Sequence, residues 1–529
     1  MTALTGTRIL LPVTMKQDIR NVAPWVVVIS VLSASSILAY RFIFPEDAER
    51  MAFANTVGSN PGLWFVFGKP LDMMTNDGFN AWRAGSLGAF FTGLMAILIV
   101  VRNSRAAEDS GQAELIASGV VTRQARLMVA IVMAAIASVG TGVLSFVVTM
   151  ACGGAWKPTL VLSACFTASG LMFGSLAAVT AQLGSYARTA SSLAVGLLGI
   201  GYVIRGYLDS SDSPDWVIWA TPLGWLERTR PSTDNNGWPL LAALAFTVLM
   251  VVLAWTLQRR RDFGLGMIPA RPGPANGGLV ASVGGLAVRV NRGSLLTWLA
   301  AFAALGFVFG NLSASVGDLL AANPSIAAVI ASGAVTETDL TFAFACTMLQ
   351  ITGILAAVTG VQVMMRLYVE ESELRAEPVL AGALRRPTYL ASHVVLALVA
   401  SGVALLVTGT GVGLVVSTSD TGVQFGDVLA QAGATVPAAW VLVAVSVAAI
   451  GAHPGKRLVA WAAVVATFAL TLLGPTFDLP NWALGISPLH HVPTVTAANP
   501  DWRSLVVLCG LVVLLGVVGF AGYRRRDIG

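Results

Sequence analysis

Long apolar runs separated by short polar segments fill almost the whole of this 529-residue chain. Runs such as 87–101, 125–152 and 505–520 resemble the stretches of about 20 apolar residues that helices need to cross a bilayer. The period-two alternation of a transmembrane β-barrel is absent from them. The pattern therefore predicts an all-α polytopic membrane protein.

The apolar runs predict about twelve transmembrane helices, six in each half of the chain. In the first half they lie near 24–42, 85–101, 126–150, 158–181, 190–208 and 238–257. In the second half they lie near 294–312, 343–366, 388–416, 433–452, 457–474 and 503–522.

The two halves match each other when the chain is shifted by about 263 to 266 residues. Asn60-Pro61 then meets Asn323-Pro324, and the hexapeptide "RRRDFG" meets "RRRDIG" at the end of the chain. Six crossings return both Arg triplets to the same side of the membrane, so the repeat is parallel rather than inverted. We expect two parallel six-helix repeats at 1–264 and 286–529, joined by a Pro/Gly linker at 265–285.

Composition and charge agree with this topology. Only 11% of the residues are charged, whereas soluble domains carry about 25%. The net charge of +5 comes from basic residues beside apolar runs, which set the orientation of the spans rather than indicate a nucleic-acid partner. Most of them face the cytoplasm if the N-terminus does. We therefore expect a multi-pass protein of the bacterial plasma membrane with both termini in the cytoplasm.

The first apolar run has a second interpretation. Basic residues Arg8, Lys16 and Arg20 precede it, as in a cleaved signal peptide. The long segment ahead of the run and the lack of a clean A-x-A site favour a retained first span.

A polar loop follows the second predicted span of each half. The loops read "VRNSRAAEDSGQAELIASGVVTRQARL" and "MRLYVEESELRAEPVLAGALRRPTYLASH". Each has acidic residues, a short amphipathic segment, a glycine that could end a helix in the left-handed conformation, and an arginine before the next span. The acidic side chains could pair with basic groups of a partner or fix the bend of the chain. A solvated charged loop is the plainer interpretation, but its occurrence in both halves favours a function. The residues are Glu108, Glu114, Gly119 and Arg123, then Glu371, Glu377, Gly382 and Arg386.

These loops, with "NPGLWFVFGKPLDMMTNDGFNAWR" and "TPLGWLERTRP", resemble ABC exporter permeases, and more narrowly the polyketide-antibiotic exporter permeases of the tetronasin-resistance type. The resemblance covers essentially the whole chain. The family often has three acidic residues together, whereas this chain has Ala107-Glu108-Asp109 and Glu370-Glu371-Ser372.

The resemblance implies that each loop is a coupling helix seated on a separate ATP-binding subunit, with two copies of that subunit in all. It also implies amphipathic elbow helices at 8–22 and 286–295. The outer segments 216–231 and 482–493 would fold partly back into the membrane.

The chain itself lacks a phosphate-binding loop. Neither Gly68-Lys69-Pro70 nor Gly455-Lys456-Arg457 has the Ser or Thr and the upstream glycine of that motif. We therefore expect a non-catalytic subunit with no cofactor of its own, and ATP and Mg on the partner.

Two other classes of function are less well supported. An ion-driven carrier usually keeps carboxylates or broken helices near the middle of the membrane, and no Asp or Glu lies well inside a predicted span. A membrane-embedded enzyme would gather acids or histidines near an interface. The outer candidates do not complete a metal or catalytic set: Asp72, Asp77, Asp209, Asp212, His490 and His491.

The expected cargo is a hydrophobic, drug-like or antibiotic molecule that leaves the cell through a cavity between the halves; export of lipid or cell-envelope precursors is the alternative. Arg205 stands near the outer end of a span, where it could snorkel to water, line the substrate path or pair with Asp209. Apolar side chains on the second and fifth spans are candidates for the cavity wall: Phe90, Phe91, Met95, Tyr202, Phe344 and Met348.

Overall fold

The computed structural model divides into two units, residues 1–273 and 274–529, and each is taken here by itself. Helix accounts for 84% of the structure, and no strand occurs in the part of the chain that it describes. Among the described residues, eleven helices are long and apolar enough to cross a membrane. The predicted all-α polytopic class is therefore confirmed. The described residues are 6–58, 61–111, 122–211, 214, 216–261, 265–268, 282–314, 337–382, 384–419, 421–473, 480–497 and 499–526.

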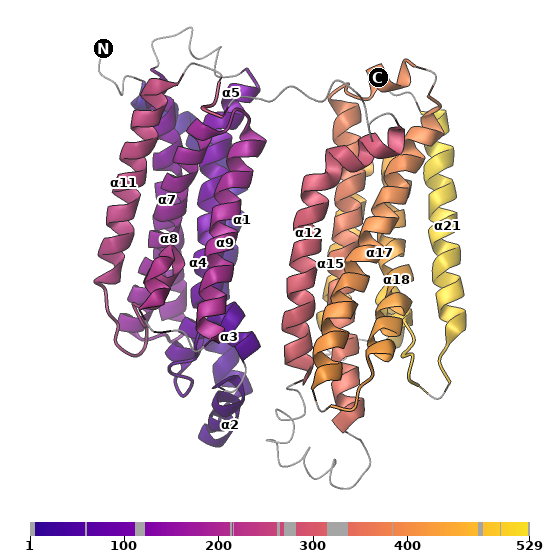
Figure 1. The fold of residues 1–529 in the computed structure, drawn as a ribbon, viewed down its shortest axis with the longest axis horizontal. Helices are drawn as coiled ribbons and strands as arrows, with labels where there is room; N and C mark the ends of the chain where they lie inside the picture. The colour runs from indigo at the N-terminus through magenta and orange to yellow at the C-terminus, as the bar shows by residue number, and fades with distance from the viewer. Residues whose placement is uncertain are drawn as a thin grey trace. The chain divides into compact units, whose positions relative to one another are not determined.

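Six long helices build the first unit (Figure 1). Local signals explain several of their ends: Thr75 and Thr122 cap two of them by accepting hydrogen bonds from backbone N–H groups, and Pro239 begins the last. The helices are α1 (Thr7–Ile43), α4 (Asn76–Val101), α7 (Arg123–Ala151), α8 (Trp156–Leu183), α9 (Ala187–Ser210) and α11 (Pro239–Arg260).

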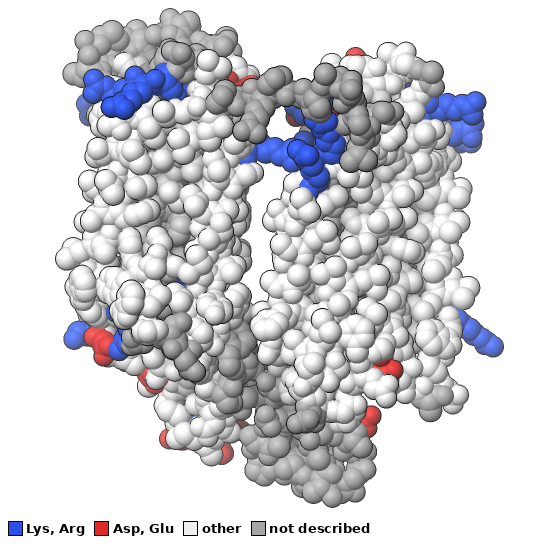
Figure 2. Space-filling view, in the orientation of Figure 1, with Lys and Arg blue, Asp and Glu red and all other residues white. Residues whose placement is uncertain are grey.

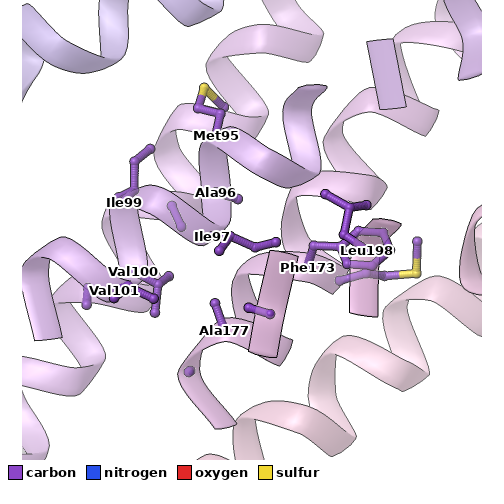
Figure 3. Packing of buried hydrophobic residues seen from close by; sticks show 14 of the residues in the cluster. Met95, Ala96, Ile97, Ile99, Val100, Val101, Phe173, Ala177 and Leu198 are labelled. Carbon is purple, nitrogen blue, oxygen red and sulfur yellow. The ribbon is translucent and has the colours of Figure 1, made fainter. Parts of the chain in front are cut away.

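The core of the first unit lies where α4, α7, α8 and α9 meet. Phe173 of α8 packs among Ile97 of α4 and Leu198 of α9 (Figure 3). Small residues let the helices approach: a Cβ on Gly88 would lie 2.4 Å from the Phe166 ring. Close packing at small residues is how helices associate in lipid, where burial of apolar surface supplies little force between them.

Among its described residues, the second unit also has six helices of 16 residues or more. They pack closely at glycines, as in the first unit: a Cβ on Gly451 of α18 would lie 2.3 Å from the Gly519 carbonyl of α21. The helices are α12 (Val283–Ala314), α15 (Glu337–Ser372), α17 (Arg386–Thr418), α18 (Phe425–Ala452), α19 (Leu458–Leu473) and α21 (Trp502–Arg525).

A helix stands at each of the twelve predicted spans, but one of them is short. α19 has 16 residues, and residues 474–479 after it lie outside the described chain. It is therefore not among the eleven candidate spans.

The predicted elbow helices are not separate elements. Residues 8–22 are the first part of α1, and 286–295 are part of α12. Pro24 lies inside α1 and removes one hydrogen-bond donor, but a helix can continue past a proline at a local cost.

Short helices extend both ends of the bundles. In the first unit, α2 (Asp47–Gly58) and α3 (Pro61–Phe67) lie at the end opposite the start of α1 (Figure 1). At the other end, α4 continues through the π-helical turn η1 (Arg102–Ala106) into α5 (Ala107–Asp109). Figure 2 shows most of the visible Lys and Arg of this unit gathered at its α5 end or around its opposite rim, and few on the apolar surface between.

Candidate functional site

The second span of the first unit ends at a glycine that was not predicted to act there. Gly111 has φ 74, the left-handed conformation that a helix end favours for glycine. Its N–H donates to the carbonyl of Glu108, at 3.1 Å. Because the helix stops at this point, the Glu108 side chain is held close to the end of the bundle.

Glu108 is paired with two arginines of its own unit. Arg105 Nη1 lies 2.6 Å from Glu108 Oε2. Arg261 binds the same carboxylate in a forked geometry, with Nη2 at 2.7 Å from Oε1 and 3.0 Å from Oε2. The side chains of Glu108 and Arg261 are 9% and 7% exposed, so this is a nearly buried, charge-assisted pair.

The same cluster reaches the turn between α8 and α9. Arg105 donates to the Ser185 carbonyl, and Asp109 Oδ2 accepts from the Ala187 N–H at the start of α9. An acid at a helix N-terminus is favourable because the free N–H groups carry partial positive charge. Arg261 also donates to Gln182 Oε1 at 2.7 Å. Three segments therefore meet: the end of the second span, the α8–α9 turn, and the chain after α11.

The second unit repeats this helix end. Leu374 has φ 59, and it stands 263 residues after Gly111. The N–H groups of Leu374 and Arg375 donate to the carbonyls of Glu371 and Glu370, at 3.0 and 2.9 Å. This is the Schellman arrangement, here with a leucine at the position that favours glycine.

Glu371 is also paired inside its unit. It accepts hydrogen bonds from Arg526 Nη2 and, at 2.6 Å, from Tyr523 Oη. The neighbouring Glu370 accepts from Tyr389 Oη at 3.1 Å. We call Glu108–Arg261 the first clasp pair and Glu371–Arg526 the second clasp pair.

The other predicted loop residues are placed differently. Glu377 is exposed at the start of the four-residue helix α16 (Glu377–Leu380). Gly382 is exposed too, and its φ is not in the left-handed region. The prediction that it caps the short helix before it in that conformation is therefore wrong. Arg386 begins α17 and donates to the Arg526 carbonyl at 3.1 Å.

In the first unit, Glu114 and Gly119 lie outside the described residues, as does the side chain of Arg123. The structure thus brings together Glu371 and Arg386 around Arg526, and leaves Glu377 and Gly382 apart from them.

Sequence reasoning missed the partners of the two glutamates. It used the Arg triplets only to orient the spans, although the repeated "RRRD" signature at equivalent positions was visible. Glu108 and Arg261 are 153 residues apart, a separation across which no local pattern operates.

Arg205 lies at the opposite end of the first unit and does not snorkel. It is 1% exposed. Its guanidinium lies 3.2 Å from Asp209 Oδ2 and 2.8 Å from Glu227 Oε1, and it donates to Ser86 Oγ at 3.1 Å. The expected pairing with Asp209 is therefore present, and Glu227 is a further partner.

Backbone groups complete the surroundings of Arg205. Its Nη2 donates to the carbonyls of Phe65 and Val66 at the end of α3, at 2.9 and 3.0 Å. A Cβ on Gly206 would lie 2.4 Å from the Phe65 carbonyl, so only glycine allows α3 this close. Gly68, with φ 93, likewise passes so near Glu227 that a Cβ would be 3.1 Å from Oε1.

A cavity of about 270 Å³ opens beside this cluster. Its wall combines the charged residues Arg205, Asp209 and Glu227 with apolar and aromatic side chains, among them Trp82 and Tyr202. Such a mixture of apolar walls and a few polar groups is typical of small-molecule sites.

The predicted cavity residues divide between wall and core. Tyr202 lines the cavity, and Phe90 packs edge-on against it, with ring centroids 5.0 Å apart. Phe91 is 38% exposed, whereas Met95 is 1% exposed and belongs to the packed core in Figure 3. In the second unit, Phe344 is half-buried and Met348 is 9% exposed.

Among the described side chains, no three or more His, Cys, Asp or Glu lie together as a group that could hold a metal ion. All four cysteines are free thiols.

An all-helical chain with eleven candidate spans, equivalent helix ends in its two units and a partly polar cavity is a multi-pass membrane protein of the transporter class. A family model described as multidrug efflux system permease Rv1217c, C-terminal domain, matches residues 280–524. The chain is 34% identical to the multidrug efflux system permease protein Rv1217c of Mycobacterium tuberculosis, over 99% of this chain and 95% of the relative.

The chain therefore belongs to this family of multidrug efflux permeases. The prediction of a drug-exporter permease is confirmed at this level, while the tetronasin-resistance type stays a prediction.

Proposed function

We propose that the chain is the membrane-spanning subunit of an ATP-driven ABC exporter, which moves hydrophobic drug-like or antibiotic molecules out of the cell. ATP and Mg would bind to separate ATP-binding subunits, one for each half. The observation that carries this proposal is the 34% identity with a multidrug efflux permease over 99% of the chain. The lack of a phosphate-binding loop in the sequence supports a separate ATPase.

The acidic residues of the two loops differ in their contacts, and we propose different roles for them. Glu108 and Glu371 are engaged inside their own units, so we propose that they fix the helix ends rather than touch the partner. Glu377 is exposed at the start of α16. We propose that Glu377, and Glu114 in the first half, face basic groups of the ATP-binding subunits.

We place the clasp pairs on the cytoplasmic side of a bacterial plasma membrane. Two Arg triplets stand beside them at the ends of α11 and α21, and clustered arginines next to spans favour the cytoplasm. ATP is available only on that side, which fits the coupling proposed for Glu114 and Glu377.

For the substrate we propose that the cavity beside Arg205, with Tyr202 and Trp82 at its wall, contributes contacts to the export path. Its aromatic and apolar walls suit a hydrophobic molecule, and its charged groups suit one with a polar substituent.

The docking role is tested with the double variant Glu114→Arg/Glu377→Arg. Reversing both charges should lower co-purification with the ATP-binding subunit and reduce drug-stimulated ATP hydrolysis about tenfold or more, because like charges would then face each other. Glu46→Arg is a matched control, since Glu46 is exposed next to α2 at the opposite end of the first unit. Normal drug stimulation in the double variant would show that these acids do not dock the partner.

A further inference from the structure

We propose that Arg261 and Arg526, the third arginine of each triplet, are positioning residues that fasten the end of the second span to the end of the sixth span in each half. The loop that follows the second span would then move with the sixth span as one body. The mechanical consequence rests on the proposed coupling to an ATPase, whereas the clasp itself does not.

The two arginines occupy the same local structure. Arg261 follows α11 with φ −97 and ψ 152, and Arg526 follows α21 with φ −86 and ψ 150. In each case the helix has just ended and the extended residue aims its side chain inward, while the two arginines before it are exposed: Arg259, Arg260, Arg524 and Arg525. Within each triplet only the third arginine makes a clasp pair.

The two glutamates are also equivalent. Glu108 and Glu371 each stand three residues before a left-handed residue, Gly111 or Leu374. Since both partners of each pair have the same backbone geometry in both halves, the clasp is a feature of the repeat. If these arginines served only to orient the spans in the membrane, their charge would be enough. A nearly buried carboxylate paired with each of them would not be needed.

A third segment joins each clasp by different chemistry. In the first unit, Arg105 of the second span donates to Ser185 in the turn between α8 and α9. The equivalent position in the second unit is Tyr368, 263 residues later, and Arg457 from the turn between α18 and α19 stands over its ring at 4.5 Å. The arginine stands on the second span in the first unit and on the turn in the second unit. The same three segments are nevertheless joined in both halves.

These contacts would couple a movement of the loop after the second span to the fifth and sixth spans. A push on the loop after α5 would reach the sixth span through Glu108–Arg261 and the fifth span through Asp109 and Ala187. It would not depend on the lipid-facing packing of the helices.

The clasp itself is tested on the purified chain without any partner, by comparing Arg261→Glu with Arg260→Glu. Both variants reverse one charge, one residue apart, but only the first breaks the pair. We expect amide hydrogen exchange at Ala187, Met267 and Ile268, whose N–H groups are bonded at this junction, to rise at least about tenfold in Arg261→Glu and to stay near wild type in Arg260→Glu. Equal exchange in the two variants would overturn the clasp.

Arg261→Lys is the milder variant, in case reversal of the charge prevents folding. Lysine keeps the charge but cannot bind the carboxylate with a fork, so its exchange should lie between that of wild type and Arg261→Glu. Exchange identical to wild type would contradict the forked geometry.

The positioning role is tested with the ATP-binding subunit present. Arg261→Glu should keep partner binding and basal ATP hydrolysis but transport about tenfold less drug per ATP, unlike Arg260→Glu. If exchange differs between these variants and transport per ATP does not, the positioning role is wrong. If the wild-type chain does not stimulate ATP hydrolysis by the ATP-binding subunit, the proposed function is wrong. The amide hydrogen exchange of the purified chain would still decide whether the clasp exists.

Swapping the acidic and the basic residue of a clasp pair tests whether the pair can be restored in the opposite orientation. Glu371→Arg/Arg526→Glu should restore transport relative to Arg526→Glu alone. The corresponding swap Glu108→Arg/Arg261→Glu should not, because Arg105 lies 2.6 Å from the Glu108 carboxylate and would repel the new arginine. Rescue in the first half but not in the second would contradict the assigned contacts.

Discussion

At the scale of single residues, buried charges near the helix ends hold distant segments together. Arg205 binds two carboxylates, one hydroxyl and two backbone carbonyls drawn from α3, α4, α9 and α10 (Pro222–Glu227). A charge buried in this way is stable only because it is paired and hydrogen-bonded. The cluster therefore determines how the end of the first unit opposite α5 is assembled.

Arg205→Met tests that statement. The substitution leaves Asp209 and Glu227 without their cation, so the free energy of unfolding should fall by about 3–5 kcal/mol. Denaturant unfolding in detergent measures the change, with Arg503→Met, an exposed arginine, as the control. A loss no larger than that of the control would mean that the pairs contribute little.

At the scale of elements, the apolar runs predict the helices well, because about 20 apolar residues are needed to cross a bilayer whatever lies around them. Some helix ends follow local signals, such as the caps Thr75 and Thr122, whereas others depend on residues that the apolar pattern does not single out. The second span ends at Gly111, which was not predicted, and the predicted elbow at 8–22 is continuous with α1. The short helices α2 and α3 were missed because, at 12 and 7 residues, they are too short to span a bilayer.

The left-handed helix ends supply a prediction for this scale. Leu374→Gly should raise the stability of the chain by about 1 kcal/mol, because a left-handed conformation costs a non-glycine residue about 1–2 kcal/mol and the Leu374 side chain is 54% exposed. Gly111→Leu should lower stability by a similar amount; nothing lies within 4 Å of a Cβ built there, so the effect would come from the backbone.

Thermal unfolding of the two variants measures both effects in one experiment. Shifts of the same sign would contradict the equivalence of these two positions in the repeat.

At the scale of the whole molecule, the helical class and the exporter family followed from the sequence, because composition and repeated motifs extend over the entire chain. The site followed only in part. Glu108 and Glu371 were identified as important, but their partners Arg261 and Arg526 were not, and neither was Glu227 as a partner of Arg205. These contacts join elements far apart in sequence, so only the folded structure brings them to light.

The most direct test of the central claim is drug transport by lipid vesicles that contain the purified chain. We expect transport only when the ATP-binding subunit and ATP are both present, and no loss of it when ionophores remove every ion gradient. Transport by vesicles that contain this chain alone, driven by an ion gradient, would contradict the claim.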